Sequence, residues 1–278
     1  MTTPRNRLNR GPTTERTDYT DQDVLVALPV FNEANHVEDV LRAVSQYASN
    51  LLVIDDGSTD GTARLLERVV LRHACARFVT HGVNMGYGRS LIDAFSCAGG
   101  EGFAWIITMD CDHQHEPSCI PEFLCEIRND DADIISGSRY LRPTDLGTIP
   151  APPERVAINR AVTGLLNRHL GLCLTDAFCG FKAYRVRALA KLTLTEAGYG
   201  LPLQLWVQAS RAGLTIREIP VPLIYDDRKR NFAGILENPG KRMQYYLAII
   251  ERELGRDLCG GFEESLHLAE IGRPLGRS

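Results

Sequence analysis

The 278-residue sequence has no long apolar run, no paired-cysteine motif and no excess of basic charge. No segment approaches the ~18 consecutive apolar residues of a membrane-spanning helix, and the polar N-terminus does not resemble a secretory signal. The eight cysteines are scattered without CxxC spacing, which favours reduced thiols in a cytoplasmic protein over a disulfide framework. With 31 Lys and Arg against 35 Asp and Glu, the net charge of -4 provides no overall field for binding nucleic acid.

The sequence does have the composition of a folded protein, with 44% hydrophobic and 24% charged residues. Residues 1–22 are polar and rich in Arg and Thr, and we expect them to form a disordered tail. The pattern changes abruptly at Val24, where apolar runs begin, and we predict a single domain over 23–254. Residues 255–278 are expected to form a weakly structured C-terminal tail.

Short apolar runs alternate with helical patterns over the first 140 residues. The apolar runs predict strands at residues 24–29, 51–55, 76–80, 103–110 and 133–137. Between them, apolar residues recur with helical spacing, which is typical of βαβ units on a parallel sheet. We therefore predict an α/β fold with a mostly parallel central sheet flanked by helices.

The second half of the sequence is less regular and is predicted to wrap around one edge of this sheet. A proline-rich loop is expected at 143–154 and an irregular stretch at 175–185. Helices are predicted at 155–170, 200–213 and 238–254, and an extended segment at 215–225. A charged loop follows the extended segment.

Polar residues follow three of the predicted strands, at the edge where ligands bind in open parallel sheets. The three segments read PVFNE (29–33), DDGSTDG (55–61) and DCDHQ (110–114). Carboxylates gathered at one edge repel each other unless a counter-charge is present. A divalent cation or a ligand rich in hydrogen-bond donors is therefore the expected partner.

Each of these segments also has a structural explanation when it is taken alone. Asp110 and Asp112 can both offer oxygen to Mg²⁺ or Mn²⁺, but they can equally cap the helix that follows. The aspartates at 55 and 56 also fit a turn in which Thr59 or Asp60 caps the next helix. The occurrence of all three segments at successive strand ends favours a site.

Six motifs occur in the order seen in family-2 glycosyltransferases with the GT-A fold. They are PVFNE, VIDDGSTDGT, VNMGYG, MDCDHQHEP, GSRY and DAFCGFKAYR. Over residues 23–254 the sequence most resembles the branch that contains dolichol-phosphate mannose synthase and related polyprenyl-phosphate glycosyltransferases. The resemblance implies a Rossmann-like GT-A sheet whose irregular C-terminal portion faces the acceptor.

The resemblance also implies roles for individual residues. The donor nucleotide would be bound by Pro29, Phe31, Glu33, Ile54, Asp56, Asp110 and Cys111. A Mg²⁺ or Mn²⁺ ion bridging the donor diphosphate would be held by Asp110, Asp112 and Gln114. Such a cation offsets charge on the departing diphosphate. Arg139 in the GSRY motif would bind a phosphate, for which its planar guanidinium is better suited than a lysine.

The implied reaction is an inverting transfer in which Asp112, Arg139 and Asp176 are the catalytic candidates. An acceptor phosphate is already an anion and needs little general base, whereas an acceptor hydroxyl needs one. Asp176 is the candidate for that base, with a capping or loop-fixing hydrogen bond as its alternative role.

The sequence departs from the lipid-phosphate branch after the extended segment, where the Gly-x-Ser-Lys signature expected for that branch is missing. Arg228 and Arg230 could bind phosphate there, or they could belong to a solvated charged loop. Arg155 and Asn159 could supply a second acceptor-phosphate contact, or lie on a solvent-facing helix. The QxxRW signature of processive synthases is also absent, which argues against a cellulose-type polysaccharide synthase.

The resemblance implies transfer of a hexose from a nucleotide-diphosphate sugar, with GDP-mannose as donor and a polyprenyl or dolichyl phosphate as acceptor being the first expectation. We expect a nucleotide-sugar donor, a lipid acceptor met by peripheral contact at the cytosolic membrane face, and no nucleic-acid partner. The alternative is transfer from a UDP-sugar such as UDP-glucose to a hydroxyl of a glycan or small molecule.

Three other classes compete with this interpretation. A zinc site formed by Cys111, His113, His115 and Cys119 would make the protein a non-catalytic binding module. A haloacid-dehalogenase-type phosphatase would carry its DxDx[TV] motif after the first strand, whereas the DCDHQ segment follows the fourth. A glycosyltransferase-like fold could also bind a nucleotide without turnover.

Overall fold

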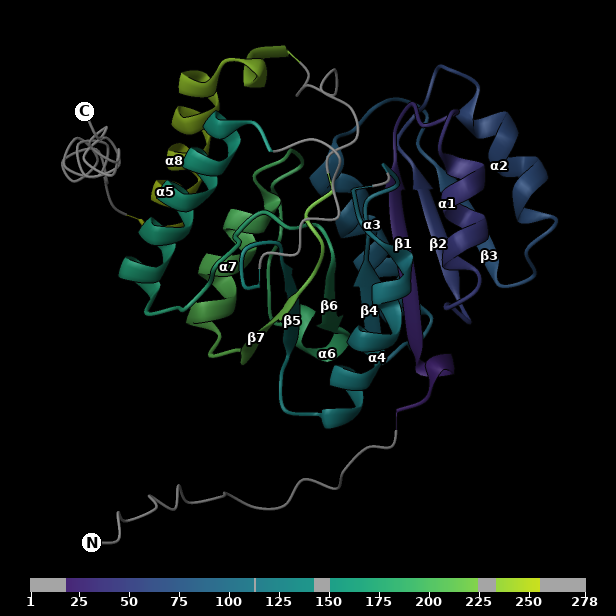
Figure 1. The fold of residues 1–278 in the computed structure, drawn as a ribbon, viewed down its shortest axis with the longest axis horizontal. Helices are drawn as coiled ribbons and strands as arrows, with labels where there is room; N and C mark the ends of the chain where they lie inside the picture. The colour runs from purple at the N-terminus through teal and green to yellow at the C-terminus, as the bar shows by residue number, and fades with distance from the viewer. Residues whose placement is uncertain (1–18, 113, 143–150, 225–233, 256–278) are drawn as a thin grey trace, which may run out of the picture.

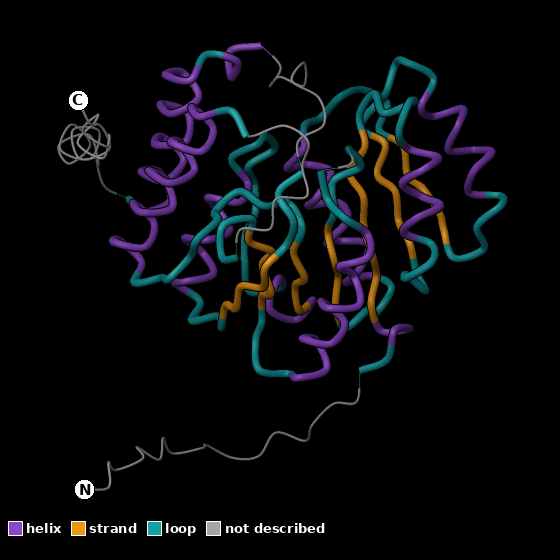
Figure 2. Tube along the Cα trace, viewed as in Figure 1, coloured by secondary structure: helices purple, strands orange, loops and turns teal. Residues whose placement is uncertain are grey.

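A computed structural model describes residues 19–112, 114–142, 151–224 and 234–255. Within these residues, a seven-stranded sheet carries helices on both faces (Figures 1 and 2). Five strands lie at predicted positions: β1 (Val24–Val30), β2 (Leu51–Asp55), β3 (Ala76–Thr80), β4 (Trp105–Thr108) and β5 (Ile134–Ser138). The predicted α/β fold with a mostly parallel sheet is confirmed.

The second half of the chain adds two strands, β6 (Lys182–Arg185) and β7 (Ile216–Pro220). The strand order is β3-β2-β1-β4-β6-β5-β7. β6 is antiparallel to both of its neighbours, β4 and β5, whereas the other neighbouring pairs are parallel. The carboxyl ends of β1, β2 and β4 therefore meet at one edge of the sheet, which is where the polar segments of the sequence lie.

β6 was not predicted, because its sequence KAYR contains two charged residues that are nevertheless buried. The Lys182 ammonium donates to the carbonyl oxygen of Cys179 and lies 5.4 Å from the centroid of a Trp206 ring. The Arg185 guanidinium lies 4.6 Å from a ring centroid of Trp105 and forms an ion pair with Asp130 at 2.6 Å. These partners allow both charged side chains to be buried, so the strand forms although its sequence contains no apolar run. The expectation of an irregular stretch at 175–185 is therefore wrong for its last four residues.

The alternation of side chains along β1 divides the hydrophobic core between the two faces of the sheet. Leu25 and Ala27 pack on one face, and Val24, Val26 and Leu28 on the other. The first face is covered by α3 (Tyr87–Gly100), α5 (Pro153–Leu170), α6 (Val186–Leu189), α7 (Leu201–Arg211) and α8 (Pro239–Leu254). The second face is covered by α1 (Val37–Val44), α2 (Thr62–Val70) and α4 (Ile120–Asn129).

The helix α8 is delimited by strong local signals at both ends. The Asn238 side chain accepts a hydrogen bond from the backbone of Lys241 at 3.0 Å, and Pro239 occupies the first helical position. Gly255 ends the helix in a left-handed conformation with a φ of 66°. α8 then packs against α5 and α7, so the three helices form one group beside β5 and β7 (Figure 1).

Short 3₁₀ helices occur at Asp21–Asp23, Pro117–Cys119 and Gly234–Glu237. Most of the two predicted tails lies outside the described residues, namely 1–18 and 256–278, whereas residues 19–22 and Gly255 are described. The first eight residues of the proline-rich loop and most of the charged loop that contains Arg228 and Arg230 also lie outside them. No helix within the described ranges has both the length and the apolar character needed to cross a bilayer.

Candidate active site

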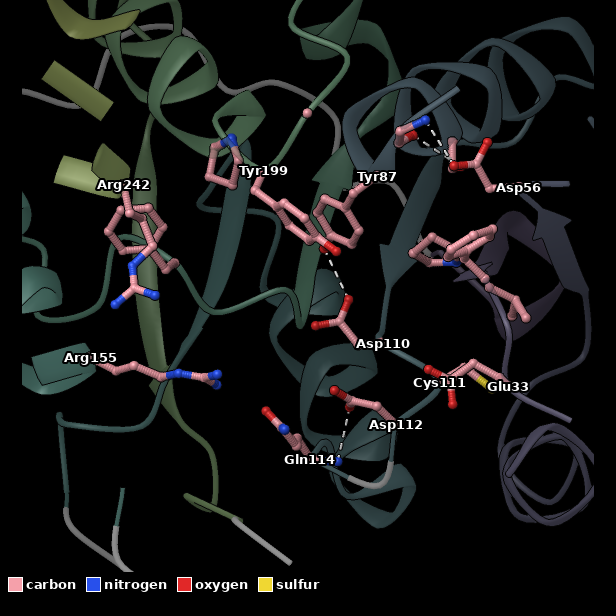
Figure 3. A pocket seen from close by; sticks show the side chains of 18 of the residues that line it. Glu33, Asp56, Tyr87, Asp110, Cys111, Asp112, Gln114, Arg155, Tyr199 and Arg242 are labelled. Carbon is pink, nitrogen blue, oxygen red and sulfur yellow. Dashed lines mark hydrogen bonds between the residues drawn. The ribbon is translucent and has the colours of Figure 1, made fainter. Parts of the chain in front are cut away.

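A pocket of about 590 Å³ opens at the carboxyl edge of the sheet and is lined by residues from both halves of the chain (Figure 3). Most of the predicted site residues line it: Pro29, Phe31, Glu33, Asp56, Asp110, Cys111, Asp112, Gln114, Arg139, Arg155 and Asn159. The fold thus brings the three strand-end segments together with side chains that lie far from them in sequence.

The segment after β1 forms the first wall of the pocket through a turn centred on Asn32, which has a φ of 58°. Its backbone N–H donates to Ser58 Oγ at 2.8 Å, and its side-chain oxygen accepts from the backbone of Thr59 at 2.8 Å. These bonds fasten the first strand-end segment to the second. Phe31 stays 43% exposed at the pocket, which leaves its ring available to stack on a planar ligand.

The second segment serves partly as the turn and helix cap that the sequence also allowed. The Asp60 carboxylate accepts hydrogen bonds from the backbone N–H groups of Thr62 and Ala34, each at 3.0 Å. Asp60 therefore has a structural role. Asp56, in contrast, lines the pocket.

Asp56 is 3% exposed and fixes the loop that leads into α3. Its carboxylate accepts hydrogen bonds from the backbone N–H groups of Met85 and Gly86, each at 2.8 Å. The same carboxylate lies 2.7 Å from Nδ1 of His81, whose other ring nitrogen lies 3.0 Å from the carboxylate of Asp93. Asp56 therefore holds the entry to α3 in place at the rim of the pocket.

The third segment presents two carboxylates to the pocket (Figure 3). Asp110 Oδ1 accepts a hydrogen bond from the Tyr87 hydroxyl at 2.9 Å, and Asp112 Oδ1 accepts one from the backbone of Gln114 at 3.0 Å. Gly180 lies directly behind Asp110, and a Cβ added there would come within 2.5 Å of a carboxylate oxygen. A glycine at 180 is therefore needed for Asp110 to hold this position.

His115 is a neutral ring that holds the backbone of Asp110 in place through a hydrogen bond. Its Nδ1 accepts the backbone N–H of Asp110 at 3.0 Å, so the ring proton is on Nε2. Burial lowers the pKa of His115 to about 4, with the Asp110 carboxylate acting in the opposite direction. The ring is therefore uncharged at neutral pH.

The zinc interpretation finds no support in the described part of the chain. Cys111 and Cys119 are both buried, and burial raises the pKa of their thiols to about 12 and about 11, so both are protonated when no metal is bound. His115 uses Nδ1 to accept a backbone hydrogen bond. No group of three or more His, Cys, Asp or Glu side chains suited to a metal occurs among the described residues, which exclude His113.

Asp176 forms a bidentate ion pair with Arg139, with distances of 2.6 and 2.9 Å from the carboxylate oxygens to Nε and Nη2. Asp176 is fully buried and also accepts a hydrogen bond from the Asn159 side chain at 2.7 Å. Burial acts to raise the pKa of Asp176, but the Arg139 guanidinium outweighs it and holds the pKa well below the usual range. Arg139 and Asn159 line the pocket and Asp176 lies behind them.

This arrangement bears on two expectations from the sequence. Asp176 does not line the pocket, and its oxygens already accept hydrogen bonds from Arg139 and Asn159, which matches the loop-fixing role that the sequence also allowed. Ile54 does not line the pocket either, and its side chain is fully buried in the core, which leaves only its backbone for a contact with the nucleotide. Asp176 instead orients Arg139 and Asn159.

Sequence reasoning did not assign several aromatic and basic residues that line the pocket. The Tyr87 and Tyr199 rings are stacked with centroids 5.6 Å apart and an interplanar angle of 16°. Arg242 and Tyr246 reach the pocket from α8. Tyr87 lies within the VNMGYG motif, which gave a signal, whereas nothing in the sequence around Arg242 distinguishes it from a surface residue of an amphipathic helix.

Comparisons with known proteins agree with this fold and site. The model of the family Glycosyl transferase family 2 matches residues 25–193. The chain is 28% identical over 206 residues to the undecaprenyl-phosphate mannosyltransferase of Micrococcus luteus, covering 72% of this chain and 83% of that protein. It is also 28% identical over 207 residues to the polyprenol monophosphomannose synthase of Mycolicibacterium smegmatis, covering 72% and 77% of the two chains.

Among solved structures, the chain resembles glucosyl-3-phosphoglycerate synthase from Mycobacterium tuberculosis in complex with Mn²⁺, UDP and glucosyl-3-phosphoglycerate. The TM-score is 0.63 at 21% identity, and the match covers 88% of this chain and 87% of that one. At this level of identity the likeness concerns the fold, which is the GT-A arrangement expected from the sequence.

Proposed function

The chain belongs to glycosyl transferase family 2, and from this we propose that it is an inverting, metal-dependent glycosyltransferase with a polyprenyl phosphate as acceptor. The donor is a nucleoside-diphosphate hexose, with GDP-mannose as the first candidate. The observation that carries the proposal is one pocket that unites a pair of carboxylates, an exposed aromatic ring and several guanidinium groups.

The wall formed by the segments after β1, β2 and β4 suits the donor. Phe31 offers an exposed ring for the base, and Glu33 and Asp56 offer acceptors beside it. Pro29 and Cys111 complete the apolar floor of this wall. We assign the nucleotide to this wall because an aromatic ring can stack on the planar base, and carboxylates can accept hydrogen bonds from the base and from the ribose hydroxyls.

The residues present also fit a hard divalent cation. Asp110 and Asp112 supply two carboxylates and Gln114 a side-chain amide oxygen at the pocket surface. That number of protein ligands is usual for Mg²⁺ or Mn²⁺ when diphosphate oxygens and water complete the shell. When bound, such a cation would offset the negative charge that develops on the departing diphosphate.

The acceptor is assigned to the opposite wall, where Arg139, Asn159 and Arg155 lie. In the proposed reaction a phosphate oxygen of the acceptor attacks the anomeric carbon and the bond to the nucleoside diphosphate breaks, which inverts the configuration. Asp176 keeps Arg139 oriented towards this phosphate and takes no proton itself. A phosphate acceptor suits the site because it needs no general base.

A second candidate acceptor is a small phosphorylated hydroxy acid used with a UDP-sugar, and the observation that favours it is the fold likeness to the phosphoglycerate-dependent enzyme. Its hydroxyl would need a base, and Asp176, the residue expected for that task, is buried behind Arg139. The lipid phosphate therefore remains the preferred acceptor.

We further propose that residues 23–254 form the catalytic domain and that the protein meets its lipid acceptor by peripheral contact with a membrane. The packing of Tyr19 against Trp105, with ring centroids 6.2 Å apart, suggests that the domain extends a few residues further towards the N-terminus.

Transfer assays test the proposal directly. The purified chain is incubated with Mn²⁺, GDP-mannose or UDP-glucose, and either farnesyl phosphate or glycerate 3-phosphate, and products are identified by mass spectrometry. We expect a mannosyl phosphodiester from GDP-mannose and farnesyl phosphate. A product from UDP-glucose and glycerate 3-phosphate alone would establish the second candidate in its place.

A further inference from the structure

The pocket has an acidic wall and a basic wall, and the proposed reaction transfers a hexose from one to the other. Asp110 and Asp112 lie on the acidic wall (Figure 3). The basic wall carries the guanidinium groups of Arg139, Arg155 and Arg242. The residues that would contact the hexose itself must lie beside the acidic wall, where the donor is bound.

Two stacked tyrosines, Tyr87 and Tyr199, line the pocket beside this wall (Figure 3). The Tyr87 hydroxyl donates to Asp110 Oδ1 at 2.9 Å, and the ring centroids of the two tyrosines are 5.6 Å apart. The pair joins the two halves of the chain, because Tyr87 begins α3 and Tyr199 lies just before α7. Tyr199 is therefore connected to the acidic wall through a single side chain.

The loop that carries Tyr199 is packed tightly against the start of α3. The backbone N–H of Arg89 donates to the carbonyl oxygen of Ala197 at 3.0 Å. A Cβ at Gly86 would lie 2.4 Å from the same oxygen, so the two backbones are closer than side chains would allow. Main-chain contacts thus fix the position of one ring relative to the other.

α8 supports the same loop from a second side. The Tyr245 hydroxyl accepts the backbone N–H of Gly200 at 3.2 Å and donates to the carboxylate of Glu196 at 2.7 Å. The other carboxylate oxygen of Glu196 forms an ion pair with Arg252 at 3.1 Å. Since the loop is held on both sides of Tyr199, a ligand that packs on this ring would not have to order it first.

Tyr199 remains 40% exposed although Tyr87 covers one face of its ring. Aromatic surface left open in the wall of a pocket is typical of ligand-binding sites. The face of an aromatic ring carries partial negative charge, which attracts the weakly positive C–H groups of a sugar ring and repels an anion. The exposed surface of Tyr199 therefore suits a hexose better than it suits the phosphate of the acceptor.

The distance from the proposed cation site also favours the hexose. In a nucleoside-diphosphate sugar the hexose is bonded directly to the diphosphate, which is assigned to Asp110 and Asp112. Tyr199 is separated from Asp110 by one tyrosine ring and one hydrogen bond. The base lies at the opposite end of the donor, and the exposed ring of Phe31 is available to it.

We propose that Tyr199 binds the hexose of the donor by stacking against it, and that Tyr87 backs this ring and ties it to Asp110. The inference rests on the proposed function, since it takes the diphosphate to lie at Asp110 and Asp112. The ligand class is a hexopyranose linked to a nucleoside diphosphate.

The test compares Tyr199→Leu with Tyr47→Leu, a matched control in which the same side chain is replaced away from the pocket. Tyr47 is half-buried, packs against the core on the face of the sheet covered by α1, and does not line the pocket. GDP, GDP-mannose, UDP and UDP-glucose are titrated calorimetrically into each protein in the presence of Mg²⁺. Melting temperatures show whether each variant is folded.

We expect Tyr199→Leu to weaken binding of the nucleotide sugar by ~10-fold, the usual size of a lost aromatic contact. The affinity for the corresponding nucleoside diphosphate should stay within about twofold of wild type, because the base and the diphosphate do not contact this ring. Tyr199→Phe should restore most of the loss, since it keeps the aromatic face. Tyr47→Leu should bind both ligands as wild type does.

Saturation-transfer NMR on the wild-type protein keeps the test independent of how any variant folds. With Mg²⁺, which is diamagnetic, and the nucleotide sugar present, irradiation of the aromatic resonances of the protein should saturate the C–H protons of the hexose. Absence of this transfer would overturn the inference. An equal loss of affinity for the nucleotide sugar and the nucleoside diphosphate in a folded Tyr199→Leu protein, or no loss for either, would overturn it too.

Failure of the proposed function gives a different result from failure of this inference. If the wild-type protein binds neither GDP nor UDP, the proposed function is overturned, and the inference with it. If a nucleoside diphosphate binds but Tyr199→Leu does not discriminate against the attached hexose, only the role of Tyr199 is overturned.

Discussion

Asp112 lies at the centre of the proposed chemistry, and its environment permits a conservative test. Its Oδ1 accepts the backbone N–H of Gln114, a role that the amide oxygen of asparagine can also fill. Asp112→Asn should therefore keep the local fold while removing one of the two carboxylates offered to a cation. We expect the turnover number to fall by at least ~100-fold, since a cation contributes several kcal/mol to such transition states. The measurement is the steady-state rate over a range of Mn²⁺ concentrations, with melting temperature as the control for folding. A variant that keeps the wild-type rate and metal dependence would remove Asp112 from the mechanism.

The Arg139–Asp176 pair makes a separate prediction about stability. Asp176→Asn leaves the Arg139 guanidinium without its compensating charge in a buried position, which typically costs ~3–5 kcal/mol. Asp39→Asn is the control, because Asp39 forms only an exposed pair with Arg42 and should change stability by less than ~0.5 kcal/mol. Urea unfolding at pH 7 measures both variants. Equal stabilities of the two variants would contradict the structural role given to Asp176.

The same pair predicts how stability depends on pH. The folded pKa of Asp176 is held below its unfolded value by Arg139, so the stabilisation is fully present above about pH 4. It should be lost as the pH falls through the lowered pKa, because the unfolded chain then binds more protons than the folded one. We expect the stability gap between wild type and Asp176→Asn to narrow as the pH is lowered from about 4 to about 2. A gap that stays constant over this range would exclude an ionised Asp176.

At the level of whole elements, the N-terminus of α3 packs tightly against the backbone of the loop before α7. A Cβ at Gly88 would overlap the carbonyl oxygen of Glu196 and lie 2.7 Å from that of Gly198. Gly88→Ala should therefore cost ~1–3 kcal/mol although alanine favours helices. Gly100→Ala, at the other end of the same helix, has open space at its Cβ and should be neutral or slightly stabilising. Thermal melts of both variants measure the difference, and a Gly88→Ala protein as stable as Gly100→Ala would mean that this contact is not tight.

Elements with a regular apolar period could be predicted from the sequence, and those held by compensated charges could not. The runs that became β1, β2, β4 and β5 are apolar because both of their faces are buried. β6 could not be predicted from the sequence, because the groups that compensate the charges of Lys182 and Arg185 are brought close only by folding. These groups are the Cys179 carbonyl and the Asp130 carboxylate. Its antiparallel insertion between β4 and β5 depends on these long-range contacts and leaves no local signal.

The same distinction applies to the site. The strand-end carboxylates are local in sequence and follow from the rule that ligands bind at the carboxyl edge of a parallel sheet. The burial of Asp176 and the position of Arg242 at the pocket depend on tertiary packing, because each is set by how the second half of the chain packs across that edge. Ile54 was assigned from a motif that combines a core residue of β2 with Asp56, which lines the pocket, and only the structure separates the two.

At the scale of the whole molecule, the two halves of the chain contribute opposite sides of one pocket. The first half provides the parallel strands and the acidic wall, and the second half adds β6, α5 and α8 with the basic wall. This division matches a reaction with two substrates, in which a cation-bound diphosphate and an anionic acceptor must be brought together. The family match ends at residue 193, before α8, and α8 nevertheless contributes residues to the pocket.

The most direct test of this account is calorimetric titration of GDP and UDP into the wild-type protein, with Mn²⁺ and again after chelation with EDTA. We predict that one of the two diphosphates binds in the presence of Mn²⁺ and that its affinity falls at least ~10-fold, or ~1.4 kcal/mol, when the cation is removed. Tight binding of GDP would favour the mannosyl donor, and tight binding of UDP the glucosyl one. Absence of binding by either nucleotide, with and without the cation, would contradict the assignment of this pocket to a nucleotide-sugar donor.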